Sequence, residues 1–119
     1  MQTLSKVDIA ADISFSYNWN KKLYCRFFTT IRLANYKKYH VGNVYRIMHK
    51  ENYAFDGMIV KIDYYKLHEI PEAVCMLDTG LTKPETIELI QKKYSGKNID
   101  WSSQLLCVLL IENTQWDKP

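Results

Sequence analysis

An unbroken apolar run near the end of the chain, residues 105–111 (LLCVLLI), constrains the fold more than any other feature. Successive side chains of a β-strand point to opposite faces, so a strand with one wet face alternates apolar and polar residues. A run that is apolar at every position indicates a strand buried on both faces, with a packed layer on either side. The run is far shorter than the ~18 to 20 residues that cross a bilayer as a helix.

Other segments also have strand character. Alternation of apolar with polar residues, or enrichment in aromatic and β-branched residues, is typical of strands. These features occur at residues 13–17 (ISFSY), 25–33 (CRFFTTIRL), 43–50 (NVYRIMHK) and 58–67 (MIVKIDYYKL).

The strands expected at 43–50 and 58–67 are close in sequence, which favours a hairpin. Residues 52–57 separate them, and we expect the turn there because Asp56-Gly57 is a typical hairpin pair. Residues 1–11 show neither strand nor helix periodicity, and we expect them to form a loosely held leader.

Two helices are expected between the hairpin and the apolar run. The first covers residues 71–77, begins with a proline and is followed by Gly80, a residue that readily adopts the left-handed stop conformation. The second begins at Thr82, which forms a capping box with Glu85. The resulting order, four strands, two helices and one strand, predicts a single α+β domain over residues 1–119. We expect a small curled sheet or β-barrel of about five or six strands with two helices packed beside it.

Charge is distributed unevenly over the 119 residues. Residues 1–50 hold nine Lys/Arg against two Asp, a balance of +7, whereas residues 51–119 have seven Lys/Arg against eleven Asp/Glu, a balance of −4. The basic half predicts either attraction of phosphate or nucleic acid, or a solvated surface that pairs with the acidic half after folding.

Several site classes find no support in the sequence. The three cysteines are widely separated and show no zinc spacing, and the chain has no Gly-rich phosphate loop. We therefore expect no metal and no cofactor. The N-terminus lacks the apolar segment of a secretory signal, and together with reduced cysteines this favours a cytoplasmic protein without membrane association.

The strand at 25–33 carries the strongest candidate site. Alternation puts Thr30 and Arg32 on one face, and Thr29 and Ile31 on the other with Phe27. A hydroxyl and a guanidinium two residues apart are able to bind an anion or a base edge. The alternative is an exposed strand on which Thr30 is simply a good strand former and Arg32 is solvated.

Basic and aromatic residues precede this strand. Lys21, Lys22 and Arg26 are placed to attract phosphate, and Trp19 offers a face on which an unpaired base stacks, or else belongs to the core. We expect Tyr17, which continues the apolar face of 13–17, in the core.

The order of these motifs resembles the ASCH domain family, which is related to the PUA-like β-barrels. The Thr-x-Arg strand is followed by a basic stretch, by "VG" before a strand, by "LDTGL" between two helices and by "YSG" before an apolar closing strand. The resemblance covers about residues 13–112, and "FSYNWNKKL" is similar to a small bacterial branch. It implies a barrel with a cleft beside the helices that binds RNA or a modified nucleoside.

One branch of that family consists of acetylcytidine amidohydrolases with a lysine, a threonine and an acidic residue. Thr30 matches the threonine and Asp78 falls near the acidic position, but Phe27 stands where that branch has lysine. The resemblance thus implies a binding module in which Asp78 contacts the polar edge of a bound base. The alternative is a small amidohydrolase with Thr30 as nucleophile and Asp78 beside it. Without a ligand, Asp78 would bond its own turn backbone.

Overall fold

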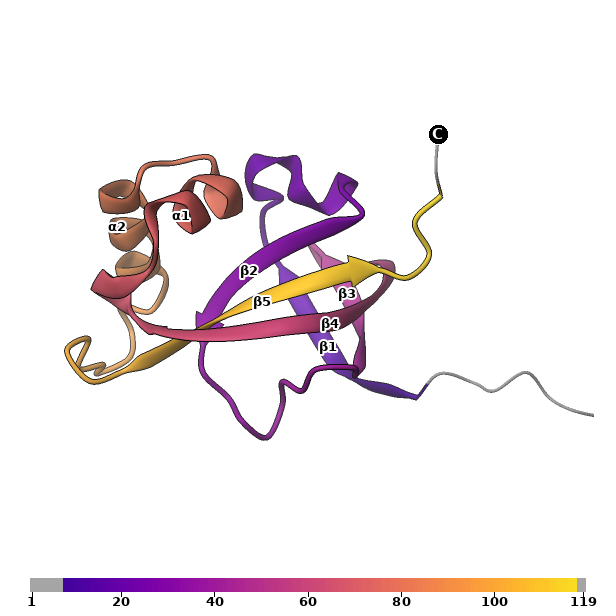
Figure 1. Ribbon diagram of the computed structural model, residues 1–119, viewed down its shortest axis with the longest axis horizontal. Helices are drawn as coiled ribbons and strands as arrows, with labels where there is room; N and C mark the ends of the chain where they lie inside the picture. The colour runs from indigo at the N-terminus through magenta and orange to yellow at the C-terminus, as the bar shows by residue number, and fades with distance from the viewer. Residues whose placement is uncertain (1–7, 118–119) are drawn as a thin grey trace, which may run out of the picture.

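A five-stranded mixed sheet with two helices at one end forms the fold in the computed structural model, which describes residues 8–117 (Figure 1). The α+β class expected from the sequence is confirmed. Two short 3₁₀ segments, η1 and η2, interrupt the connections. In chain order, the elements are β1 (Ile9–Phe15), η1 (Trp19–Tyr24), β2 (Phe27–Leu33), β3 (Val44–His49), β4 (Asn52–Lys66), η2 (Leu67–Glu69), α1 (Glu72–Thr79), α2 (Lys83–Lys93) and β5 (Leu105–Asn113).

The sheet is curled but is not closed into a barrel, so the expected closure is wrong. Its strand order is β1-β3-β4-β5-β2, with β1 parallel to β3 and the other neighbours antiparallel. The edge strands β1 and β2 meet through side chains: Arg32 Nη2 donates to the Ser14 carbonyl at 2.7 Å, and the Phe15 and Phe28 rings pack edge to face. Side chains therefore fill the seam that backbone hydrogen bonds would close in a barrel.

Strand β5 is buried on both faces, as its sequence predicts. Cys107, Leu109 and Ile111 belong to a core enclosed by the curled sheet. Leu106 and Val108 point the other way, into a second core beneath the helices with Ile31, Ile70, Cys75 and Ile90. The helices therefore cover one end of the sheet, and the cores lie on either side of β5.

The hairpin of β3 and β4 is confirmed, but its predicted turn is wrong. The turn is formed by Lys50 and Glu51, both left-handed with φ of 49° and 70°, between the paired residues His49 and Asn52. Gly57 lies within β4 instead. A Cβ there would come within 2.7 Å of Ile111 Cγ2, so Gly57 allows close packing rather than a turn.

Both helix signals are confirmed. The α1 helix ends at Gly80, which is left-handed with φ of 77° and bonds back to the Met76 carbonyl at 2.8 Å. In α2 the Thr82 hydroxyl accepts from the Glu85 N–H, and the Glu85 carboxylate accepts from the Thr82 N–H. A buried hydrogen bond of 2.9 Å between the Thr79 and Thr86 hydroxyls joins the two helices.

The expected leader is partly wrong. Strand β1 begins at Ile9, so residues 9–11 belong to the sheet rather than to a loose leader. Asp8 precedes the strand and is exposed, and residues 1–7 of that leader lie outside the described residues. Within residues 8–117, no helix has the length and apolar character needed to cross a membrane.

Candidate functional site: a cationic cavity between β1, β2 and α2

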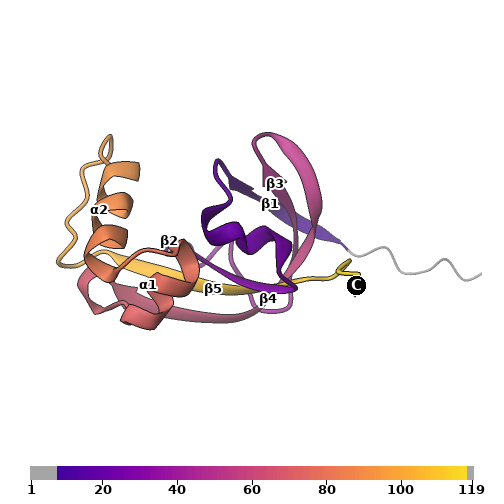
Figure 2. The ribbon, with the colours of Figure 1, turned by 90° about the horizontal axis from the view of Figure 1, so that it is seen from above.

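A cavity of about 640 Å³ lies between the β1 edge, η1, β2 and the last turns of α2. Figure 2 shows the arrangement from above: α2 and the β1–β3 arm of the sheet stand on opposite sides of η1. The volume falls in the range of about 300 to 1,000 Å³ that is typical of small-molecule sites. The end of α1 completes the wall through Asp78 and Thr79.

Thr30 and Arg32 lie on the same face of β2 and both line this cavity. Arg32 Nε donates to Thr30 Oγ1 at 3.1 Å, and the guanidinium also lies 4.8 Å from the centre of the Phe15 ring. Together with the bond to Ser14, these contacts fix the fork of Arg32. Two of the five guanidinium N–H groups make these bonds, and the Tyr39 hydroxyl also lies near the guanidinium, so the remaining N–H groups can donate to a ligand.

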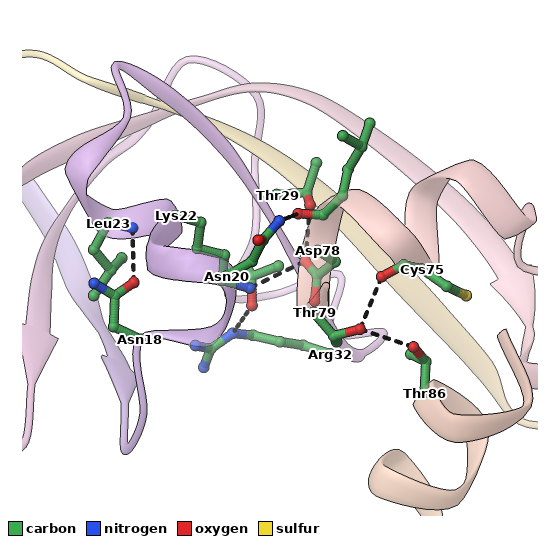
Figure 3. A network of polar contacts seen from close by, with 12 residues as sticks. Asn18, Asn20, Lys22, Leu23, Thr29, Arg32, Cys75, Asp78, Thr79 and Thr86 are labelled. Atoms are coloured by element: carbon green, nitrogen blue, oxygen red, sulfur yellow. Dashed lines mark hydrogen bonds and ion pairs between the residues drawn. The ribbon is translucent and has the colours of Figure 1, made fainter. Parts of the chain in front are cut away.

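A buried ion pair stands beside this fork. Lys22 Nζ donates to Asp78 Oδ1 at 3.1 Å, and the two side chains are only 7% and 6% exposed. The Thr29 hydroxyl donates to the same oxygen at 2.8 Å (Figure 3). Asp78 Oδ2 accepts no hydrogen bond from the described part of the chain. The carboxylate thus joins η1, β2 and α1 and keeps one oxygen for a further donor.

The conformation of η1 directs Lys22 into the cavity. Asn20 and Lys21 are both left-handed, with φ of 57° and 54°, which kinks the segment. The Asn20 amide donates to the Leu77 carbonyl at 3.0 Å, and Asn18 Oδ1 accepts from the Leu23 N–H at 2.9 Å. Asparagine tolerates this backbone region better than most residues, whereas lysine is strained in it.

Positive charge dominates the cavity wall. Lys22, Arg32, Lys92 and Lys93 line it, and Asp78 is the one carboxylate among the lining residues. Burial lowers the pKa of Lys22; the pair with Asp78 opposes this shift and Arg32 adds to it. The pKa of Lys93 is lowered by burial and then by Arg32 and Lys22. Cations that depress one another's pKa values form a site that favours an anion.

An aromatic group borders the opening. Trp19 lines the cavity and packs edge to face on Tyr17, with ring centres 4.6 Å apart. Tyr17 is 55% exposed, so its expected place in the core is wrong. It lies two residues beyond the end of β1, where the chain has left the sheet and alternation no longer applies. Trp19 is half-buried.

Two of the predicted binding residues lie outside the cavity. Lys21 is exposed and does not line it. Arg26 immediately precedes β2 and pairs with Glu112 on β5 at 2.9 Å. The structure therefore brings together Trp19, Lys22, Thr30, Arg32 and Asp78 from the predicted set.

Sequence reasoning missed the α2 side of the cavity. Lys92 and Lys93 lie in the last turn of α2, and no local signal in the sequence relates them to β2. It also missed Thr29, whose bond to Asp78 joins residues 49 positions apart. Ser14 and Ser16 did have a signal, since they alternate with the apolar residues of 13–17.

The described part of the chain holds no group of three or more His, Cys, Asp or Glu residues that could hold a metal ion. Cys75 and Cys107 are buried, and Cys25 is exposed.

Fold and site together define a class: an α+β protein with an open, curled mixed sheet and a cationic cavity at its seam. Searches against protein-family models, curated proteins and solved structures find no match to this chain.

Proposed function

We propose that this protein is an ASCH-like module that binds RNA or a modified nucleoside in the cavity between β1, β2 and α2. The observation that carries the proposal is the fixed fork of Arg32. Thr30, Ser14 and Phe15 orient it at a site with excess positive charge, and N–H groups that these contacts do not use are able to donate to a ligand.

The cavity offers complementary groups for such a ligand. The free guanidinium N–H groups suit a base carbonyl or a phosphate oxygen. Asp78 Oδ2 suits an exocyclic amino group, and Trp19 provides a stacking surface at the opening. Lys92 and Lys93 add long-range attraction for phosphate. The motif order of the ASCH family and the curled sheet with two adjoining helices are consistent with this assignment.

A thermal-shift panel of modified nucleosides, nucleotides and short RNAs tests the proposal, because a ligand of the native state raises the melting temperature. We expect at least one member to stabilise the protein, with an effect that weakens between about 50 and 200 mM salt. Arg32→Gln is expected to remove the shift. Arg26→Gln is the matched control, since Arg26 lies outside the cavity.

Two results would contradict the proposal. One is a panel without any stabilising member at low salt. The other is stabilisation that survives in Arg32→Gln and disappears in Arg26→Gln.

A hydrolase is the second candidate, and the placement of Lys22 favours it. Phe27 occupies the position of the family's lysine, but Lys22 brings an amine into the cavity that Thr30 and Asp78 also line. Burial lowers the Lys22 pKa, which increases its neutral fraction. In this reaction Thr30 Oγ1 attacks the acyl carbonyl and its proton passes to neutral Lys22. The C–N bond then breaks as the base amine leaves protonated, and water hydrolyses the acyl-threonine.

Incubation with acetylcytidine, followed by chromatography for cytidine and acetate, distinguishes this candidate from a binding module. We expect an enzyme to lose turnover in Thr30→Ala. Absence of cytidine, or equal turnover in Thr30→Ala, would contradict a hydrolase with Thr30 as nucleophile.

A further inference from the structure

A second hollow adjoins the cavity on the far side of Arg32. It measures about 320 Å³ and lies between the end of β2, the loop that follows it and the chain just beyond α2. Arg32 and Tyr94 line both spaces. The two spaces therefore adjoin each other at these two side chains.

This second hollow is also cationic. Arg32, Lys38 and Lys97 line it, and none of its lining residues is acidic. The Tyr39 hydroxyl remains neutral near pH 7, because burial raises its pKa against the opposing effect of Arg32. The site thus combines three cations with neutral hydrogen-bonding groups, which is the composition expected for phosphate.

The backbone holds both lysines in place. The Lys38 N–H donates to Asn35 Oδ1 at 3.1 Å and its carbonyl accepts from the Tyr45 hydroxyl at 2.7 Å. The Lys97 N–H donates to the Tyr94 carbonyl at 3.0 Å. Lys38 Nζ also lies 5.5 Å from the centre of the Tyr39 ring. These contacts fix the backbone at both lysines, and the Tyr39 ring also contacts the Lys38 ammonium.

We propose that the second hollow is a phosphate subsite, and that the ligand of this protein is a nucleotide whose base enters the cavity while its phosphate contacts Lys38, Lys97 and Arg32. This inference rests on the proposed function and adds that the ligand carries a phosphate. A terminal phosphate and an internucleotide phosphate share this chemistry.

Isothermal titration calorimetry with matched ligands distinguishes a terminal phosphate from an internucleotide phosphate. The probes are the common ribonucleosides and acetylcytidine, their 5′- and 3′-monophosphates, and a short single-stranded RNA. The proteins are wild type, Lys38→Gln/Lys97→Gln, and Lys61→Gln as a control on β4 outside both spaces. In the wild type we expect a monophosphate or the RNA to bind about tenfold more tightly than the matching nucleoside. In the double variant this gain should fall to about twofold or less, with nucleoside affinity unchanged.

Each outcome has one meaning. A gain confined to the RNA identifies an internucleotide phosphate, and a gain with a monophosphate identifies a terminal one; both support the subsite. If nucleosides bind and the phosphate gain is absent or equal in the double variant, the subsite is refuted while the proposed function stands. If no probe binds any protein, both are refuted.

Discussion

Arg32 is the residue at which structure and proposed function meet. Its guanidinium joins the edge strands through the Ser14 carbonyl, orients the Thr30 hydroxyl and covers the Phe15 ring. It also lies between the cavity and the second hollow. A planar fork with several donors makes these contacts simultaneously, which a single ammonium group cannot do.

Arg32→Lys therefore keeps the positive charge but should lose hydrogen bonds that join the edge strands β1 and β2. We expect the free energy of unfolding to fall by about 1 to 2 kcal/mol, because hydrogen bonds from a charged donor contribute on that order. Urea unfolding measures the change. Arg26→Lys is the control: Arg26 pairs with Glu112 at the exposed surface, so its effect should stay within about 0.5 kcal/mol. Equal losses in the two variants would mean that Arg32 does not hold the seam.

At this scale the sequence predicted the part of the site that depends on local geometry. Strand alternation alone puts Thr30 and Arg32 on one face, and the structure agrees. Alternation could not separate Lys22 from Lys21, because the kink at Asn20 and Lys21 decides which lysine enters the cavity. That kink depends on contacts such as Asn20 with Leu77, which are distant in sequence.

At the scale of elements, the Lys22–Asp78–Thr29 cluster fastens η1 and α1 to β2. A buried ion pair gains little over apolar packing when intact, but removal of one member leaves an uncompensated buried charge. The cluster is thus expected to fix where α1 and η1 lie more than to add stability.

A double-mutant cycle tests this role. Lys22→Met leaves the Asp78 charge buried, and Asp78→Asn leaves the Lys22 charge buried, so we expect each to lower the free energy of unfolding by about 3 to 5 kcal/mol. In the double variant both charges are absent, and the amide oxygen introduced by Asp78→Asn can still accept from the Thr29 hydroxyl. This variant should therefore lie within about 2 kcal/mol of wild type.

Chemical denaturation at neutral pH measures the free energy of unfolding of the wild type, the two single variants and the double variant. Additive losses in the double variant would show that the two charges act independently. If a single variant does not fold but the double variant does, this contrast still demonstrates that the two charges are coupled.

Elements with local signals were predicted, and those that depend on distant packing were not. The capping box at Thr82 and the stop at Gly80 are encoded within a few residues, and both are confirmed. The β3–β4 turn was misplaced because Lys50 and Glu51 adopt left-handed conformations without a glycine. Gly57 gave a turn signal but is needed for packing against Ile111, which becomes visible only once β5 pairs with β4.

For the whole molecule, burial on both faces of β5 links the sheet interior to the layer beneath the helices. Cys107 is fully buried in the sheet interior, and its thiol contacts the Leu33 carbonyl at 3.8 Å. Tyr39 and Tyr94 border the same region beside Arg32. Burial raises the pKa of Cys107 from 9.0 to about 11 and also raises the pKa of each tyrosine above 10.0.

These raised pKa values predict a loss of stability in alkali. Each group keeps its proton more firmly in the folded chain than in the unfolded chain, so its contribution is fully present below the unfolded pKa. For Cys107, it is lost as the pH rises from about 9 toward 11. The difference corresponds to about 2 to 3 kcal/mol for this thiol. Lys22 acts in the opposite sense, since its lowered pKa makes the folded state relatively more stable as the pH rises toward 10.5.

Cys107→Ala isolates the thiol from these other groups. Urea unfolding under reducing conditions at about pH 7 and about pH 11 should show a decline in the wild type that is larger by about 2 kcal/mol than in the variant. Any cavity left by the substitution lowers stability at both pH values alike, so the difference between the two declines belongs to ionisation. Equal declines would mean that the thiolate is accommodated at the centre of the sheet. In that case the fall in alkali would come from other groups whose pKa values burial raises, such as Tyr39, Tyr94 and Cys75.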